Sequence, residues 1–187
     1  MRRLTGQAGR LALVTTTVGF LAGAAMLCPG GAQAIGGLCN GQPASHTWLD
    51  ASGQPGPAVI DGTRGGDVIV GSDGDDTIDG RGGDDMICGG PGNDSITVGP
   101  GGDSVVRGDT GDDNLSTAGT VHRVTMVGDE GNDTLEVGNT LAPSYLVGGP
   151  GDDVLIHDGR GHVKMDGGDD FDDCVFQGGD ELANCES

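Results

Sequence analysis

The sequence predicts an all-β solenoid of nine-residue repeats, with two parallel sheets of short strands. Three observations carry this prediction. Glycine accounts for 40 of the 187 residues. The acidic residues are nearly all Asp, which favours turns, rather than the helix-former Glu. From Gly62 onward, Gly, Asp and aliphatic residues return at a fixed short interval, which is typical of a repeat architecture.

Five consecutive blocks of nine residues define the repeat: GTRGGDVIV, GSDGDDTID, GRGGDDMIC, GGPGNDSIT and VGPGGDSVV. Glycine stands fourth, Asp sixth, and Ile or Val eighth. Six Gly-rich residues form a turn, because Gly readily adopts positive φ, and the last three form a strand whose middle side chain points inward. Two units complete one circuit of the solenoid. The predicted inward residues are Ile69, Ile78, Ile87, Ile96 and Val105.

Four further copies begin at Gly108, Gly128, Gly148 and Gly167, the last without its fourth-place glycine. Their spacing grows to nineteen or twenty residues, so we expect intermediate rungs that lack the turn signature. Val124, Leu146 and Met165 are the expected inward residues of those rungs. The sixth-place acids of all nine copies are Asp67, Asp76, Asp85, Asp94, Asp103, Asp113, Asp133, Asp153 and Asp172.

The sixth-place carboxylates are predicted to stack along the two edges of the solenoid. Units that are two repeats apart stack on the same edge at about the 4.8 Å strand spacing. Two bare carboxylates at that distance repel by roughly 3–4 kcal/mol at an effective dielectric near 20. Such ladders need cations. Carboxylate and carbonyl oxygens favour Ca²⁺, whereas soft metals need nitrogen or sulfur. One ion for each stacked pair predicts about seven Ca²⁺, five on the edge from Asp76 to Asp172 and two on the edge from Asp67 to Asp103.

The G-G-x-G-x-D-x-apolar-x blocks resemble the haemolysin-type, or RTX, calcium-binding repeat over about residues 54–175. The resemblance implies a parallel β-roll, with calcium held between successive turns by the sixth-place Asp residues and turn carbonyls. The stretch from Asp84 to Asp94 and the ending from Phe171 to Glu186 are similar to small exported bacterial proteins made of little but these repeats. Many RTX toxins and proteases lack an N-terminal signal peptide, whereas residues 1–34 of this chain have the layout of one. The chain therefore differs from type I secreted toxins.

Residues 1–34 have the layout of a secretory signal peptide. Arg2, Arg3 and Arg10 precede the apolar run 11–27, and Ala32 and Ala34 occupy the positions that a signal peptidase reads. The run of about 17 residues is short of the roughly 20 that span a bilayer. Cleavage after Ala34 predicts a secreted, extracellular protein. It removes three arginines and no acid, so the net charge changes from −20 to −23.

Four cysteines remain in the predicted mature chain: Cys39, Cys88, Cys174 and Cys185. An even number in an exported chain predicts two disulfides. Three pairings are open, and the positions favour Cys39–Cys88 and Cys174–Cys185. Zinc is the competing interpretation, but the sequence has no C-x-x-C pair. We expect an N-terminal cap at 35–57, the β-roll at 58–175, and a C-terminal cap at 176–187 tied by a disulfide.

The net charge argues against nucleic-acid binding, which needs a basic face. The four histidines (His46, His122, His157 and His162) lack metal-site spacing and are interpreted as surface or turn residues. We therefore predict a monomeric calcium-binding repeat protein that is not an enzyme and does not span a membrane. The alternative is a calcium-stiffened module that binds glycan, cell wall or a protein, and a further one is an RTX module associated with a toxin or protease.

Overall fold

The computed structural model describes residues 38–43, 45–47 and 56–186, and every helix or strand element within them is a β-strand. The predicted all-β solenoid is confirmed. No helix long and apolar enough to cross a membrane occurs in this part of the chain. The predicted signal peptide lies outside the described residues.

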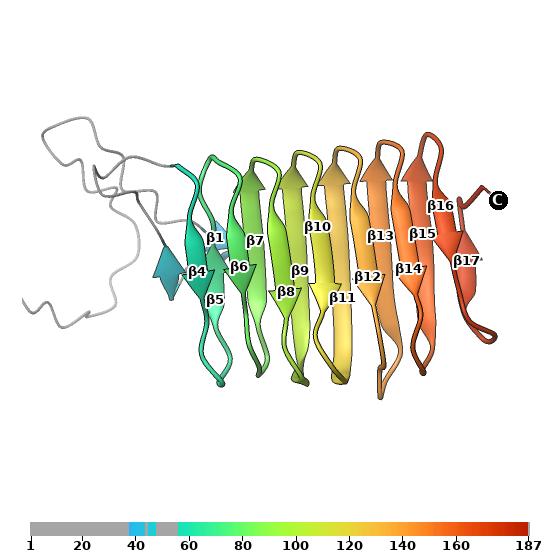
Figure 1. Cartoon of the computed structure of the whole chain (residues 1–187), viewed down its shortest axis with the longest axis horizontal. Helices are drawn as coiled ribbons and strands as arrows, with labels where there is room; N and C mark the ends of the chain where they lie inside the picture. The colour runs from blue at the N-terminus through green and yellow to red at the C-terminus, as the bar shows by residue number, and fades with distance from the viewer. Residues whose placement is uncertain (1–37, 44, 48–55, 187) are drawn as a thin grey trace, which may run out of the picture. The chain divides into compact units, whose positions relative to one another are not determined.

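Two parallel sheets face each other, and the chain alternates between them at every step (Figure 1). The even sheet contains β4 (Val59–Asp61), β6 (Thr77–Asp79), β8 (Ser95–Val98), β10 (Asn114–Thr117), β12 (Thr134–Val137), β14 (Val154–His157) and β16 (Asp173–Val175). The odd sheet contains β3 (His46–Thr47), β5 (Val68–Val70), β7 (Met86–Pro91), β9 (Gly101–Thr110), β11 (Val121–Glu130), β13 (Ser144–Pro150), β15 (Val163–Asp169) and β17 (Glu181–Ala183).

The centre of the core is one aliphatic column from each sheet, and Val98, Val121, Val124, Val137 and Val163 add to it. In-register parallel pairing stacks identical places, so Ile78 lies on Ile96 and Leu115 on Leu135. The even column contains Ile60, Ile78, Ile96, Leu115, Leu135 and Leu155, and the odd column contains Ile69, Ile87, Val106, Met126, Leu146 and Met165, all at most 1% exposed. The predicted inward places of Ile69, Ile78, Ile87, Ile96, Leu146 and Met165 are confirmed.

The turns lie along two edges. The aspartate edge joins each odd strand to the next even strand, at the top of Figure 1, and its turns end at Asp76, Asp94, Asp113, Asp133, Asp153 and Asp172. The opposite edge joins each even strand to the next odd strand. The repeat segment from the first-place glycine to the sixth-place Asp keeps six residues on this edge, as in Gly128–Asp133, whereas the even strands lengthen from three to four residues at β8. Val98, Val137 and His157 are the added buried residues.

This placement corrects one predicted inward residue, Val105, and changes the position of another, Val124. Val98 extends β8, so Val106, not Val105, pairs with Ile87 and enters the core. For the same reason Met126, rather than Val124, continues this column, because Met126 pairs with Val106. The predicted inward position of Val124 is confirmed, since the residue is 0% exposed, but it lies two residues before Met126, opposite Ser104.

Both ends carry a disulfide, and both predicted pairings are confirmed. Cys39 belongs to the antiparallel hairpin of β1 (Leu38–Cys39) and β2 (Gln42–Pro43), and it joins Cys88 on β7. Asn40 and Gly41 both have positive φ, as a two-residue hairpin turn requires. Cys174 continues the inward column after Leu155 and joins Cys185. The odd sheet extends beyond the expected roll at both ends, through β3 and β17.

Candidate metal site

The buried carboxylates of the aspartate edge form a hydrogen-bonded ladder. The backbone N–H of each sixth-place Asp donates to Oδ1 of the Asp one circuit later. The successive N–O distances, from the Asp76–Asp94 pair to the Asp153–Asp172 pair, are 2.8, 2.7, 2.8, 2.7 and 2.9 Å. All six residues are at most 3% exposed. One oxygen of each carboxylate from Asp94 onward is therefore committed to holding adjacent turns in register.

The other carboxylate oxygen has no hydrogen-bond partner among the described residues. Oδ2 is buried and unpaired at Asp85, Asp94, Asp113, Asp133, Asp153 and Asp172. A buried, unpaired carboxylate oxygen is costly, because burial removes its water without replacing it. The same feature at six repeat positions is a property of the repeat rather than a local packing defect, and it fits oxygens that could bind a cation.

A first-place glycine lies against each unpaired oxygen, with no room for a Cβ between them. A Cβ on Gly108 would lie 2.1 Å from Oδ2 of Asp113 and 2.7 Å from the carbonyl oxygen of Gly128. Gly128 and Gly148 have the same surroundings, so a carboxylate oxygen and a carbonyl oxygen of the next turn both lie close to the glycine at each of these steps. Any larger residue at these first places would displace these oxygens.

Burial changes the proton affinity of the ladder. It raises the pKa of Asp113 to about 7 and that of Asp94, Asp133 and Asp153 to about 6, and neighbouring Asp carboxylates add to the effect. The donated backbone N–H bonds oppose this rise only in part. Without a cation, these groups therefore hold protons more strongly than ordinary carboxyls do.

The donor set fits Ca²⁺. Carboxylate and backbone carbonyl oxygens are its preferred ligands, and it accepts six to eight of them in adaptable geometry. No three His, Cys, Asp or Glu side chains converge as a metal site within the described residues. A cation on this edge would take one carboxylate per turn and complete its shell mainly from backbone carbonyls.

The first two turns differ from the later ones. Oδ2 of Asp76 accepts hydrogen bonds from the N–H and hydroxyl of Ser72, and Oδ2 of Asp67 does so from Thr63. A second-place hydroxyl residue thus supplies locally the partner that the later carboxylates lack. Asp67 and Asp76, both predicted metal ligands, are therefore the predicted ligands whose Oδ2 is least available to a cation.

The opposite edge loses its carboxylates after two turns. Asp67 N–H donates to Oδ1 of Asp85 at 3.1 Å, but Asp85 N–H donates to the Ser104 hydroxyl at 3.2 Å. Ser104, Val124, Ser144 and Val163 then occupy the ladder place in succession. The expected one-sided character of the second half agrees with this placement, and it begins one turn earlier than the sequence suggested.

Asp103 is not a member of the ladder, which corrects its predicted sixth place. Its N–H donates to Oδ1 of Asp84 at 2.9 Å, which is the contact of a fifth-place residue. Its carboxylate pairs with His122 and Arg123 at the protein surface. The His122 hydrogen bond and the nearby Arg123 charge hold the pKa of Asp103 below its usual range. Counting nine residues back from Asp113, instead of forward from Asp94, identifies Ser104 rather than Asp103 as the sixth-place residue of this turn.

A second ladder at the fifth place was not predicted. Here the N–H of each turn donates to the side chain of the preceding turn, as from Asp112 to Asn93 at 3.0 Å and from Asn132 to Asp112 at 2.9 Å. Asp and Asn alternate along it, so like charges are never adjacent in the series Asp75, Asn93, Asp112, Asn132 and Asp152. The alternation of GDD and GND in the sequence is the signal that identifies it.

The histidine interpretation is wrong for His157. This side chain is 0% exposed, and its Nδ1 lies 2.7 Å from Oδ2 of Asp180. Burial alone would raise the pKa of Asp180, but hydrogen bonds from His157, Gln177 and Val163 lower it. His122 agrees with the expected surface position.

Comparison with known families agrees with this geometry. Four copies of the RTX calcium-binding nonapeptide repeat match residues 61–96 and 125–139. No curated protein and no solved structure shows a significant match to the chain. With its nonapeptide turns and two parallel sheets, the chain is an RTX-type calcium-binding repeat protein. Such repeat proteins are typically exported and non-catalytic, and the two disulfides fit an extracellular location.

Proposed function

We propose that this protein is an exported, non-enzymatic calcium-binding protein whose roll folds around Ca²⁺, held at five positions along the aspartate edge and at one position, Asp85, on the opposite edge. The observation that carries the proposal is the set of six buried, unpaired Asp oxygens, each of which lies against a first-place glycine. We propose about six ions, one for each such oxygen, rather than the seven expected when Asp103 was counted. The proposed ligands are Asp85, Asp94, Asp113, Asp133, Asp153 and Asp172, with turn carbonyls.

Calcium binding would also relieve the charge of the fold. The aspartate edge stacks carboxylates at every circuit, and the net charge of the whole chain is −20. A divalent ion between successive turns replaces repulsion with attraction and supplies the missing partner of Oδ2. Because the ions bind only where two turns are stacked, binding stabilises the native state by mass action.

Titration of the full chain with Ca²⁺, followed by calorimetry and native mass spectrometry, tests the proposal. We expect about six bound ions, with Mg²⁺ binding much more weakly because it demands strict octahedral geometry. Binding of no ion, or equal binding of Mg²⁺ and Ca²⁺, would contradict it.

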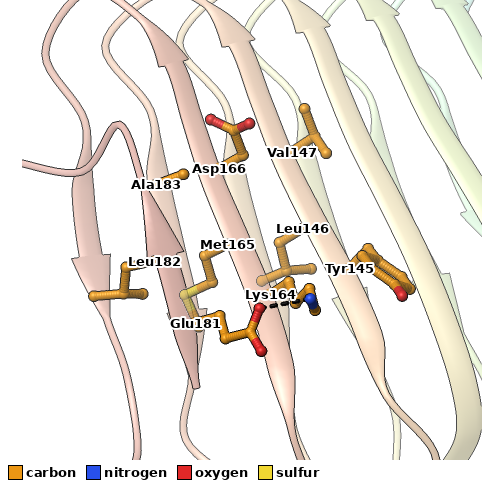
Figure 2. A pocket seen from close by; sticks show the side chains of 9 residues that line it. All are labelled: Tyr145, Leu146, Val147, Lys164, Met165, Asp166, Glu181, Leu182 and Ala183. Atoms are coloured by element: carbon orange, nitrogen blue, oxygen red, sulfur yellow. Dashed lines mark ion pairs between the residues drawn. The ribbon is translucent and has the colours of Figure 1, made fainter. Parts of the chain in front are cut away.

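A second function is favoured by the outer face of the odd sheet. Its outward places include the half-buried Val105, Val127 and Val147 next to Tyr145, which is 41% exposed. A pocket of about 300 Å³ lies on this face. Figure 2 shows the side chains that line it, among them Tyr145 and the ion pair of Lys164 with Glu181. An exposed aromatic residue beside charged groups suits a glycan, cell-wall polymer or protein segment.

A pull-down on cell-wall material and glycans, with and without chelator, tests this binding role. Retention that depends on calcium and is lost in Tyr145→Ala supports it, and equal retention of a Thr77→Ala control on the exposed outer face of the even sheet is expected. Absence of retention with calcium present contradicts it. Permeabilisation of red cells would instead favour the toxin-associated alternative.

A further inference from the structure

The C-terminal tail adds one more, shortened turn to the aspartate edge. β17 pairs with β15 in register, with Met165 opposite Leu182 and Asp166 opposite Ala183. Asn184 therefore follows at the place that Gly167 occupies one circuit earlier. The regular turn runs from Gly167 to Asp172, whereas the tail reaches the equivalent rung in three residues, where Glu186 bridges to Asp173.

Glu186 makes the ladder contact that a sixth-place Asp makes elsewhere. The N–H of Asp172 donates to Oε2 of Glu186 at 2.9 Å, as the N–H of Asp153 donates to Oδ1 of Asp172 at 2.9 Å. The N–H of Glu186 donates in turn to the carbonyl of Asp172 at 2.8 Å. Glu is one methylene longer than Asp, and this extra length compensates for the shorter turn.

Asn184 supplies the carbonyl that a first-place glycine supplies elsewhere. A Cβ on Gly167 would lie 2.1 Å from the carbonyl oxygen of Asn184 and 2.3 Å from Oδ2 of Asp172. One turn earlier, a Cβ on Gly148 would lie 2.3 Å from the carbonyl oxygen of Gly167 and 2.2 Å from Oδ2 of Asp153. The tail thus reproduces the oxygen arrangement of the internal turns without the nonapeptide sequence.

Two further contacts fix the tail in this position. Asn184 adopts a φ of +49° and donates from Nδ2 to Oδ1 of Asp166 at 2.7 Å. Cys185 is joined to Cys174. The carbonyl of Asn184 is therefore held over Gly167 by bonds on both sides rather than left at a free chain end.

Asp172 is the group that requires a partner at this end. It is 0% exposed, and its Oδ2 has no hydrogen-bond partner among the described residues. We propose that the tail completes a terminal calcium site, in which Oδ2 of Asp172 and the Asn184 carbonyl are ligands and Glu186 supplies the second negative charge. This site rests on the proposed calcium-binding function and is the last of its six positions. Calcium bound there would clamp the tail onto the roll.

The variant Glu186→Gln separates a cation role from a hydrogen-bond role. Gln keeps a side-chain oxygen that accepts from Asp172 N–H, but it removes the charge. Glu181→Gln is the matched control, because Glu181 lies in the same tail, is exposed and forms its ion pair with Lys164. Both variants would be studied as full-length, disulfide-bonded protein by calcium titration and native mass spectrometry.

We expect Glu186→Gln to lose one ion, or to bind its last ion about tenfold or more weakly, since calcium affinity follows the charge of the ligand set. Glu181→Gln should retain the wild-type number. In amide hydrogen exchange, calcium should protect residues 173–186 in the wild type and the control but not in Glu186→Gln. Wild-type ion number, affinity and protection in Glu186→Gln would overturn the terminal site alone. Absence of calcium binding by the wild type would overturn the proposed function together with it.

Discussion

The backbone N–H of Asp133 donates to Oδ1 of Asp153 at 2.7 Å, while Oδ2 of Asp153 lies buried with no partner among the described residues. The two oxygens of one carboxylate therefore have separate roles. The first aligns neighbouring turns, and the second lies against Gly148, close to a carbonyl oxygen of the following turn. Because this division recurs along the edge, fold and ion binding depend on the same side chains.

Substitution of a single ladder carboxylate should remove one ion without removing the alignment. In Asp133→Asn the amide oxygen still accepts from Asp113 N–H, but an N–H₂ group replaces the free oxygen. We expect the calcium stoichiometry to fall by about one. Asp112→Asn is the control, since Asn already occupies the equivalent fifth places 93 and 132. Equal losses in the two variants, measured by native mass spectrometry, would contradict the assignment of the sixth place.

The space next to the first-place glycines should not tolerate a methyl group. In Gly128→Ala the new Cβ would lie 2.1 Å from Oδ2 of Asp133, so the carboxylate must move. We expect a loss of about 2 kcal/mol or more in the free energy of unfolding in calcium, since both ligation and packing suffer. Gly138→Ala is the matched control, because its nearest neighbours are 3.8 Å away. Urea denaturation checks both, and a neutral Gly128→Ala would be inconsistent with an ion at this place.

The metal-free protein should be more folded in mild acid than at neutral pH. The native pKa values of Asp94, Asp133 and Asp153 are raised to about 6 and that of Asp113 to about 7, against about 3.9 in an unfolded chain. Between these values the native state binds more protons, so stability decreases as the pH rises. Circular dichroism of metal-free protein should show more β signal at pH 5 than at pH 8.

Protons and calcium should also compete. In calcium, affinity should fall as the pH drops through 6, because ligands must be deprotonated to bind. A metal-free protein that gains β signal as the pH rises would contradict the burial of these carboxyls.

The His157–Asp180 pair should stabilise the C-terminal end independently of calcium. Asp180 accepts from Val163 N–H and Gln177 N–H in addition to its bond with buried His157. In Asp180→Ala these groups lose their acceptor, so we expect a loss of about 2–4 kcal/mol in the free energy of unfolding. Asp158→Ala, at an exposed site after the same strand, should change it little. Wild-type stability of Asp180→Ala in urea would show that the pair contributes nothing.

The repeat pattern predicted most of the fold because each unit encodes its own turn and strand. The nine-residue period predicted the inward side chains from Ile69 to Ile96. Counting two units per circuit predicted which Asp residues share the aspartate edge. The pattern failed where the circuit grew, because an added Val98 lengthens a strand without leaving a turn signal, and this displaced Asp103 and Val105. The His157–Asp180 pair and the contact of Glu186 with the ladder were not predicted. Each joins residues that the nine-residue period does not relate and that only the stacking of turns brings together.

Calcium-dependent folding is the central claim, and far-UV circular dichroism of the full, disulfide-bonded chain at pH 7.5 tests it most directly. In excess chelator the stacked carboxylates have neither protons nor cations, and the core contains one main aliphatic column per sheet. We predict a largely unfolded chain in chelator, with residual order at the Cys39–Cys88 and Cys174–Cys185 ends, and a cooperative gain of β signal when Ca²⁺ is restored. An unchanged β signal and melting temperature in chelator would contradict the account.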